Sequence, residues 1–150
     1  MSDLEIRPAA ITDIPAVVAM LADDPLGAHR ESPDDLAPYR AAFQRLAHDP
    51  NQHLVVAVRD GAVVGTLQLT VIPGLSRRGS TRSIIEGVRV HADERGSGLG
   101  TRLIQWAVDE SRRQDCQLVQ LTSDATRTDA HRFYERLGFI ASHVGFKLAL

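Results

Sequence analysis

The chain has 150 residues, of which 43% are hydrophobic and 24% are charged, with a net charge of −2. This length suits one folded domain over residues 1–150, with a core large enough to need no disulfide. The weak net charge argues against a nucleic-acid partner, and the single cysteine, Cys116, favours a reducing cytoplasm. The first eight residues carry Asp3 and Glu5 without the apolar region of a signal peptide, which argues against secretion, and the lack of an apolar run of about 18 residues argues against a membrane span.

A short strand and two helices are expected in the first 50 residues. Alternating apolar and polar residues predict a strand over 4–8. Apolar residues at helical spacing predict a helix over 14–21, which ends in the segment 23–27. The run Ser32-Pro33-Asp34-Asp35 offers a capping serine, a proline and two acids, so it predicts the start of a second helix that ends at 49–51.

Three strands are predicted next along the chain. Two valine-rich runs, 53–58 and 63–72, are joined by Arg59-Asp60-Gly61, and an Asp-Gly pair is typical of a tight hairpin turn. A loop over 73–80 leads to a further strand over 83–90. Strands that follow one another through short connections are expected to pair in antiparallel fashion.

Helices and strands alternate in the C-terminal part. An amphipathic helix is predicted from Leu99, then a strand over 117–122, a helix over 130–137 with Gly138 as its cap, and a strand over 139–148. The predicted order is β-α-α-β-β-β-α-β-α-β. This order indicates an α/β protein whose mixed sheet carries helices on both faces.

A glycine-rich turn, Arg95-Gly96-Ser97-Gly98-Leu99-Gly100-Thr101, lies between a strand and a helix. The first turn of a helix has unbonded amides and the positive end of the helix dipole, and glycines let an anion approach closely. The turn therefore suits a phosphate or diphosphate, although a flexible loop would have the same spacing. A P-loop is excluded because Thr101 and Arg102 follow Gly100, and a Rossmann site because antiparallel strands precede the turn.

Two sequence blocks resemble one family. The segment 95–100, which follows Val88-Arg89-Val90, resembles the coenzyme A signature R/Q-x-x-G-x-G/A of the GNAT superfamily of N-acetyltransferases. The segment 130–139 is similar to the family's closing block, A-x-x-F/Y-Y-x-x-x-G-F, and the order of elements also fits. The sequence departs from the pattern at Ala92, where many members have proline, and at Arg127, where many have asparagine.

The resemblance implies a GNAT-type fold, with a twisted sheet of six or seven strands and about four helices. It also implies that acetyl-coenzyme A (acetyl-CoA) lies between two splayed parallel strands, 84–90 and 117–122. The backbone of Val88 and Val90 would pair with the pantetheine arm, the amides of 96–101 would hold the diphosphate, and Arg127 could reach a phosphate. The residues expected to bind this cosubstrate are Val88, Arg89, Val90, Arg95, Gly96, Ser97, Gly98, Leu99, Gly100, Thr101 and Arg127.

The family chemistry is direct attack of a neutral amine on the thioester. The resemblance implies that Tyr134 protonates the departing thiolate, and the alternative is that its ring only packs on the cofactor. Glu86 is the leading candidate base, directly or through water, because it lies in an apolar strand two residues before Val88, on the same face. It could instead be an exposed acid or an ion-pair partner. His91 is a second candidate base, with a structural role favoured.

The acceptor is expected to be a primary amine, with a small molecule favoured over a peptide or protein, and a homodimer is expected from the family. Two alternatives stay open: a non-catalytic sensor that binds acyl-CoA, and an enzyme for longer acyl chains. No histidine spacing indicates a metal, and Cys116 fits a packed side chain. Asp23 and Asp24 fit a helix end or the acceptor mouth. The cluster Arg77, Arg78 and Arg82 fits a solvated loop or a contact with an acidic acceptor group.

Overall fold

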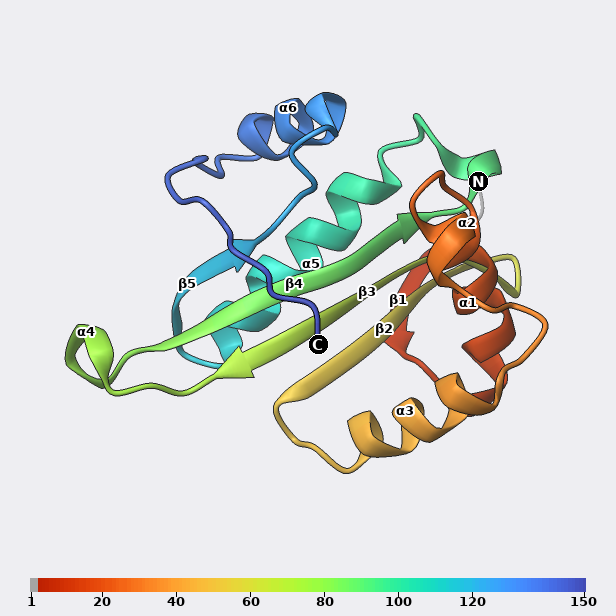
Figure 1. Ribbon diagram of the computed structural model, residues 1–150, viewed down its shortest axis with the longest axis horizontal. Coiled ribbons are helices and arrows are strands. Elements are labelled where there is room, and N and C mark those ends of the chain that lie inside the picture. Colours follow the sequence, from red (N-terminus) through yellow and green to blue (C-terminus); the bar gives the residue numbers. More distant parts are fainter. Residues whose placement is uncertain (1–2) are drawn as a thin grey trace.

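A five-stranded sheet in the order β1-β2-β3-β4-β5 forms the centre of the computed structural model, which describes residues 3–150 (Figure 1). Neighbouring strands are antiparallel from β1 to β4, whereas β4 and β5 are parallel. The expected count of six or seven strands is therefore wrong. The strands are β1 (Leu4–Pro8), β2 (Gln52–Arg59), β3 (Ala62–Ile72), β4 (Thr81–Val90) and β5 (Cys116–Leu121).

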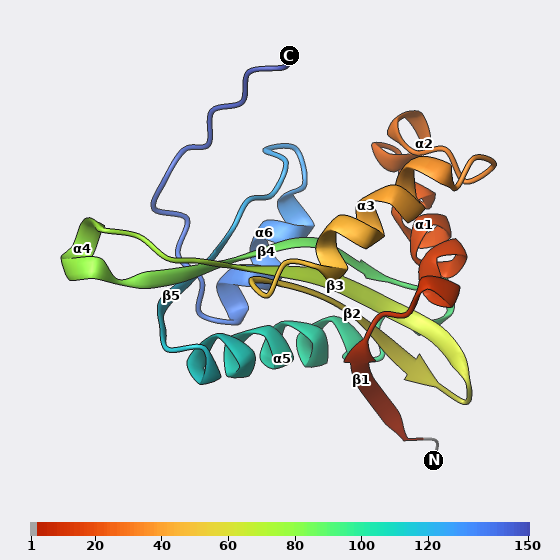
Figure 2. The same ribbon diagram turned by 90° about the horizontal axis from the view of Figure 1, so that it is seen from below.

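Helices cover both faces of this sheet, as the order of elements predicted. Figure 2 shows α5 beneath one face and α1, α2 and α3 above the other. Within residues 3–150 no helix combines the length and apolar character that a membrane crossing requires. The helices are α1 (Ile14–Ala22), α2 (Gly27–Arg30), α3 (Ala37–Ala47), α4 (Ser76–Gly79), α5 (Leu99–Arg113) and α6 (Thr128–Arg136), with 3-10 turns at Ile11–Asp13 and Ala92–Glu94.

Two predicted elements differ from the structure. The second long helix, α3, begins at Ala37 and not after Ser32, because the Ser32 hydroxyl donates to the carbonyl of Asp35 at 3.2 Å and so does not cap a helix amide. Pro38 takes the early helical position that Pro33 was expected to fill. The last predicted strand, 139–148, is not formed, because this segment pairs with no strand of the described chain.

The core lies between the sheet and α5. Leucine side chains on one face of α5 pack against β2, β3 and β4, and each buried leucine contributes about 1.5–3 kcal/mol. A buried hydrogen bond of 2.7 Å joins the hydroxyls of Ser83 on β4 and Ser111 on α5, which fixes the helix along the strand. The buried core residues are Val55, Ala57, Leu67, Leu69, Ile85, Leu99, Leu103, Ile104 and Ala107.

A β-bulge shapes the second half of β4. Gln68 pairs with Glu86 and Thr66 pairs with Arg89, so β4 carries two residues opposite Leu67. The extra residue turns Glu86 and Arg89 to the same face of the sheet, whereas Val88 packs against the core. The expectation that Glu86 and Val88 share a face is therefore wrong, because the extra residue breaks the simple alternation on which it depended.

The two parallel strands separate beside this bulge. β4 and β5 are paired from Thr81 and Cys116 as far as Ile85 and Leu121. Residues 86–90 of β4 continue beyond that point with no partner on the β5 side. An opening between these two strands was expected for the cosubstrate, and their pairing ends where that opening should begin.

Candidate functional site

The glycine-rich turn leads from β4 into the longest helix of the described chain, α5. Gly96 and Gly98 have φ angles of 83° and 86°, in the left-handed region that a side chain disfavours. A Cβ atom added to either residue would meet nothing within 4 Å. The backbone of the turn is therefore open to an incoming ligand on the side where a side chain would project.

Several amides of this turn have no protein acceptor. The Ser97 amide donates to the carbonyl of Glu94 at 3.1 Å, and the first bond of α5 runs from the Arg102 amide to the carbonyl of Gly98 at 3.2 Å. Among residues 3–150, no hydrogen bond occupies the amides of Gly98, Leu99, Gly100 and Thr101. Four neighbouring donors at the positive end of a 15-residue helix form a cradle that fits a diphosphate.

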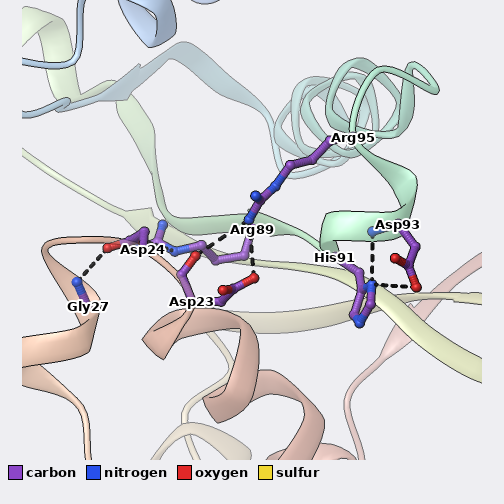
Figure 3. A network of polar contacts seen from close by, with 7 residues as sticks. All are labelled: Asp23, Asp24, Gly27, Arg89, His91, Asp93 and Arg95. Atoms are coloured by element: carbon purple, nitrogen blue, oxygen red, sulfur yellow. Dashed lines mark hydrogen bonds and ion pairs between the residues drawn. The ribbon is translucent and has the colours of Figure 1, made fainter.

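Two ion pairs tie the turn and β4 to the segment between α1 and α2 (Figure 3). The Arg95 guanidinium lies 3.3 Å from the Asp23 carboxylate, and both side chains are exposed. The Arg89 Nε lies 3.1 Å from the Asp24 carboxylate, and Arg89 also donates to the carbonyl of Val88 at 2.8 Å. Asp24 in turn accepts the Gly27 amide at 2.5 Å, so Arg89 and α2 are held by one carboxylate.

Asp24 is ionised in this network. Burial acts to raise the pKa of its carboxyl, but the Gly27 amide, the Arg89 and Arg127 charges and the Leu26 amide outweigh it and hold the pKa below its usual value. The sequence suggested a helix end or an acceptor mouth for Asp23 and Asp24. Their pairing with two expected cofactor residues was missed because no spacing rule connects positions 65 or more residues apart.

Tyr134 is oriented by the end of α6. The Phe139 amide donates to the carbonyl of Tyr134 and the Gly138 amide donates to that of Glu135, both near 3.0 Å, with Gly138 at φ 97°. These bonds form a Schellman motif. The Phe139 ring completes it by an edge-on contact with the Tyr134 ring, with 6.0 Å between the ring centroids. The prediction that Gly138 caps this helix is confirmed, and the cap holds the Tyr134 ring in place.

The Tyr134 phenol stays protonated at neutral pH. Burial raises its pKa above the ordinary value, and the positive charges of Arg127 and Arg89 oppose the rise without reversing it. Within the described part of the chain its hydroxyl forms no hydrogen bond. Arg127, exposed at the start of α6, also acts on Asp24, so α6, the second half of β4 and the α1–α2 segment lie near one another.

Both candidate bases are exposed, and only His91 has a structural hydrogen bond in the described chain. Glu86 is exposed on the sheet face that also carries Arg89, so the argument that it is a costly buried acid is wrong. His91 is exposed as well, and its Nδ1 accepts the Asp93 amide at 3.2 Å. His91 therefore caps the 3-10 turn that precedes the glycine-rich turn, as the favoured structural role required.

Other candidate residues lie away from this opening. Arg77 and Arg78 occupy a left-handed turn, α4, with φ angles of 54° and 62°, at the opposite end of β4 from the glycine-rich turn (Figure 1). Cys116 is half-buried at the start of β5, and burial raises the pKa of its thiol. No group of three or more metal-ligating side chains occurs in residues 3–150.

A hollow of about 660 Å³ lies between α1 and the start of β3. It is lined mainly by small residues of α1 and by Val63, with Asp23 and His91 among them. Neither Tyr134 nor Glu86 lines it. The hollow is therefore beside the opening that holds the chemical groups, and it does not replace that opening as the candidate site.

Comparisons with known proteins agree with this geometry. The model of the acetyltransferase (GNAT) family matches residues 14–139. The chain is 34% identical over 146 residues to the aminoalkylphosphonate N-acetyltransferase of Salmonella typhimurium, covering 97% of this chain and 91% of the relative. It is 37% identical over 90 residues to the glucosamine 6-phosphate N-acetyltransferase of Trypanosoma brucei brucei, covering 60% and 59%.

A solved structure is similar over the whole described fold. The crystal structure of a Bacillus halodurans protein described as a transcriptional regulator is 44% identical, with a TM-score of 0.94 and coverage of 99% of this chain and 100% of that one. The family match spans most of the chain, including the glycine-rich turn and Tyr134. The chain therefore belongs to the GNAT family of acetyltransferases, enzymes that use acetyl-CoA as the acetyl donor.

Proposed function

We propose that this protein transfers the acetyl group of acetyl-CoA to the primary amine of a small molecule, by direct attack while both substrates are bound. One observation carries the proposal. The cradle of unbonded amides at 98–101 and the protonated phenol of Tyr134 both adjoin the stretch of β4 that β5 leaves unpaired, through Val90 and Arg89 respectively. The cradle would bind the diphosphate of the donor, and the phenol would supply a proton to the thiolate that leaves.

The turn is suited to hold the diphosphate of the donor. The amides of 98–101 would donate to it, and Arg95 lies close enough to add a positive charge. The unpaired side of β4 beyond Ile85, which includes Val88 and Val90, offers backbone groups to an extended pantetheine arm.

Two side chains would manage the protons. Acetyl-CoA supplies a thioester carbonyl that an amine can attack, with the coenzyme A thiolate as leaving group. Tyr134 would donate its phenolic proton to that thiolate, which its raised pKa permits at neutral pH. Glu86, whose side chain on β4 is exposed, would accept the proton that the amine loses, directly or through water.

The acceptor is proposed to carry an anionic group beside its amine. The two named relatives acetylate an aminoalkylphosphonate and a sugar amine phosphate, which share this combination. Arg127 supplies an exposed positive charge at the opening. We also expect the protein to work in the cytoplasm as a single domain.

A release assay for free thiol tests the reaction with a panel of aminoalkylphosphonates, amino sugar phosphates and their neutral counterparts. Tyr134→Phe should lower kcat about 100-fold with little change in the KM for acetyl-CoA, within the usual range for a general acid. Tyr39→Phe is the matched control, because within residues 3–150 the Tyr39 hydroxyl bonds only Glu31 and the Ser32 amide. An unchanged kcat for Tyr134→Phe would refute the acid role.

A second candidate is a sensor that binds acyl-CoA without turning it over. The Bacillus halodurans relative, described as a transcriptional regulator, favours it. Heat released on binding acetyl-CoA, together with no thiol release across the whole amine panel, would decide for the sensor. A longer acyl donor remains a third candidate, tested by the same assay with acyl-CoA of increasing chain length.

A further inference from the structure

The chain contains a single lysine, Lys147, although it has sixteen arginines. Lysine is among the commonest residues of globular proteins, so this imbalance is unusual. The two side chains also differ in reactivity. An arginine guanidinium keeps its proton and its delocalised charge, whereas a lysine amine that loses its proton is a nucleophile. Lys147 is therefore the one side chain of this sequence that can be acetylated as a primary aliphatic amine.

Lys147 lies in the C-terminal tail, residues 140–150. Every residue of this tail is exposed. Within residues 3–150, no backbone hydrogen bond involves positions 143–150. The Lys147 side chain is thus in contact with solvent, and few interactions oppose a shift of the segment that carries it. An acceptor amine must be free to approach a thioester, and these properties leave Lys147 free to do so.

The tail passes the end of β5 just before it reaches Lys147. A Cβ atom placed on Gly145 would lie 4.0 Å from the side chain of Thr122, which directly follows β5. β5 ends at Leu121, which pairs with Ile85 at the last step before β4 continues without a β5 partner. Lys147 is therefore two residues along the chain from a contact at this point of separation. Two extended residues span about 7 Å, and the lysine side chain adds four carbons to that reach.

The charge of Lys147 acts beside the candidate site. Hydrogen bonds from Thr126 chiefly hold the pKa of Asp124 below its usual value, against the effect of burial, and the charges of Arg127 and then Lys147 add to them. The Asp124 carbonyl also accepts the Arg127 amide at 3.0 Å. Arg127 in turn acts on the phenol of Tyr134. A short series of interactions thus connects Lys147 with the proposed acid.

The tail lies on the same side of the sheet as the proposed base. In Figure 2 it rises on the side that carries α1, α2 and α3, opposite α5. Arg89 projects to this side, because it pairs with Asp24 in the segment between α1 and α2. Glu86 shares a face of β4 with Arg89. An amine carried by the tail would therefore approach β4 from the side on which Glu86 can accept its proton.

We infer, on the basis of the function proposed above, that Lys147 is an acetylation site and that the active site of its own chain modifies it. The neutral Lys147 amine attacks the thioester carbonyl, so that a carbon–nitrogen bond forms and the carbon–sulfur bond breaks. The sulfur takes the phenolic proton of Tyr134 and leaves as the thiol of coenzyme A. The proton lost by the amine passes through Glu86 or water and restores the phenol. The products are Nε-acetyl-lysine and coenzyme A, and no further reactant is needed.

Mass spectrometry of the 150-residue protein incubated with acetyl-CoA alone tests the site. We expect the added mass of one acetyl group, which peptide mapping should place on Lys147. Lys147→Arg keeps the charge and removes the amine, so it should lose this label and keep its thiol release with small amines. An unmodified Lys147 in a protein that acetylates small amines would overturn this inference alone. A protein that acetylates neither would overturn the proposed function as well.

A relocated lysine separates catalysis from spontaneous acetylation. Lys147→Arg combined with Arg77→Lys moves the only lysine to the exposed turn at the opposite end of β4. This variant should stay unlabelled under conditions that label the parent protein. Tyr134→Phe should label Lys147 about 100-fold more slowly than the parent protein does. Equal labelling of the two lysines, or an unchanged labelling rate in Tyr134→Phe when its kcat for small amines falls, would indicate a spontaneous reaction and overturn the inference.

A mixture of two variants tests transfer within one chain. Tyr134→Phe retains the lysine without the proposed acid, and Lys147→Arg retains the acid without the lysine. In an equal mixture, Lys147 should be labelled as slowly as in Tyr134→Phe alone. Faster labelling in the mixture would mean that one chain acetylates another, and it would overturn modification by the chain's own site.

Discussion

Gly98→Ala separates the shape of the glycine-rich turn from the general stability of the fold. Gly98 has φ 86° and ψ 6°, and holding alanine in this left-handed region costs about 1–2 kcal/mol. For a chain of this length we expect a melting temperature about 2–8 °C lower. If alanine keeps the conformation, its methyl group stands in the open space where the diphosphate would approach. If it relaxes, the amides of Leu99 and Gly100 turn away.

Either outcome removes at least one hydrogen bond to a charged group, worth about 1.5–3 kcal/mol, so the Kd for coenzyme A should rise about 10- to 150-fold. Gly61→Ala is the matched control. Gly61 has φ 76° in the β2–β3 hairpin turn, and an added Cβ there also meets nothing within 4 Å. It should lose similar stability and keep its coenzyme A affinity, measured by titration calorimetry. Equal affinities for the two variants would refute the cradle.

Three further predictions concern titratable groups. Asp13→Asn should lower the free energy of unfolding in urea at pH 7 by about 1.5–3 kcal/mol. The Asp13 carboxylate accepts two hydrogen bonds from Arg7, at 2.7 and 3.1 Å, and one from the Ala10 amide. The Arg7 hydrogen bond lowers the pKa of Asp13, so this stability is present above pH 4 and should be lost as pH falls below it. Tyr134 must be protonated to act, and burial raises its pKa, so the alkaline limb of kcat should lie above pH 10; a limb near pH 8 would contradict this. Asp23→Asn should tighten coenzyme A binding up to about five-fold by freeing Arg95, and weaker binding would contradict it.

Local chemistry was sufficient to predict most elements of this fold. The Asp60-Gly61 turn adopts positive φ at both residues, as the hairpin interpretation of Arg59-Asp60-Gly61 requires. The glycine-rich turn and Gly138 also lie where the sequence placed them, since each helix end depends on a few consecutive residues. These predictions are confirmed because the decisive interactions lie within one turn of the chain.

Features that depend on distant partners were not predictable. The bulge in β4 exists only because β3 pairs with it in a shifted register, so the face that Glu86 occupies could not follow from β4 alone. The segment 139–148 has the alternation of side chains expected for a strand but pairs with no strand among residues 3–150. Alternation predicts that a face will be buried, and it does not identify the molecule that buries it.

Two adjacent carboxylates have different parts in this site because their surroundings differ. Asp23 and Arg95 are more than half exposed, and such a pair is worth at most about 1 kcal/mol. A diphosphate bearing two negative charges can displace Asp23 from Arg95 at little cost. Asp24 and Arg89 are partly buried, and breaking that pair would leave the buried Arg89 Nε without its partner. We therefore expect cofactor binding to exchange the outer pair and to leave the inner pair in place, so that Arg89 and the α1–α2 segment stay fixed while Arg95 moves.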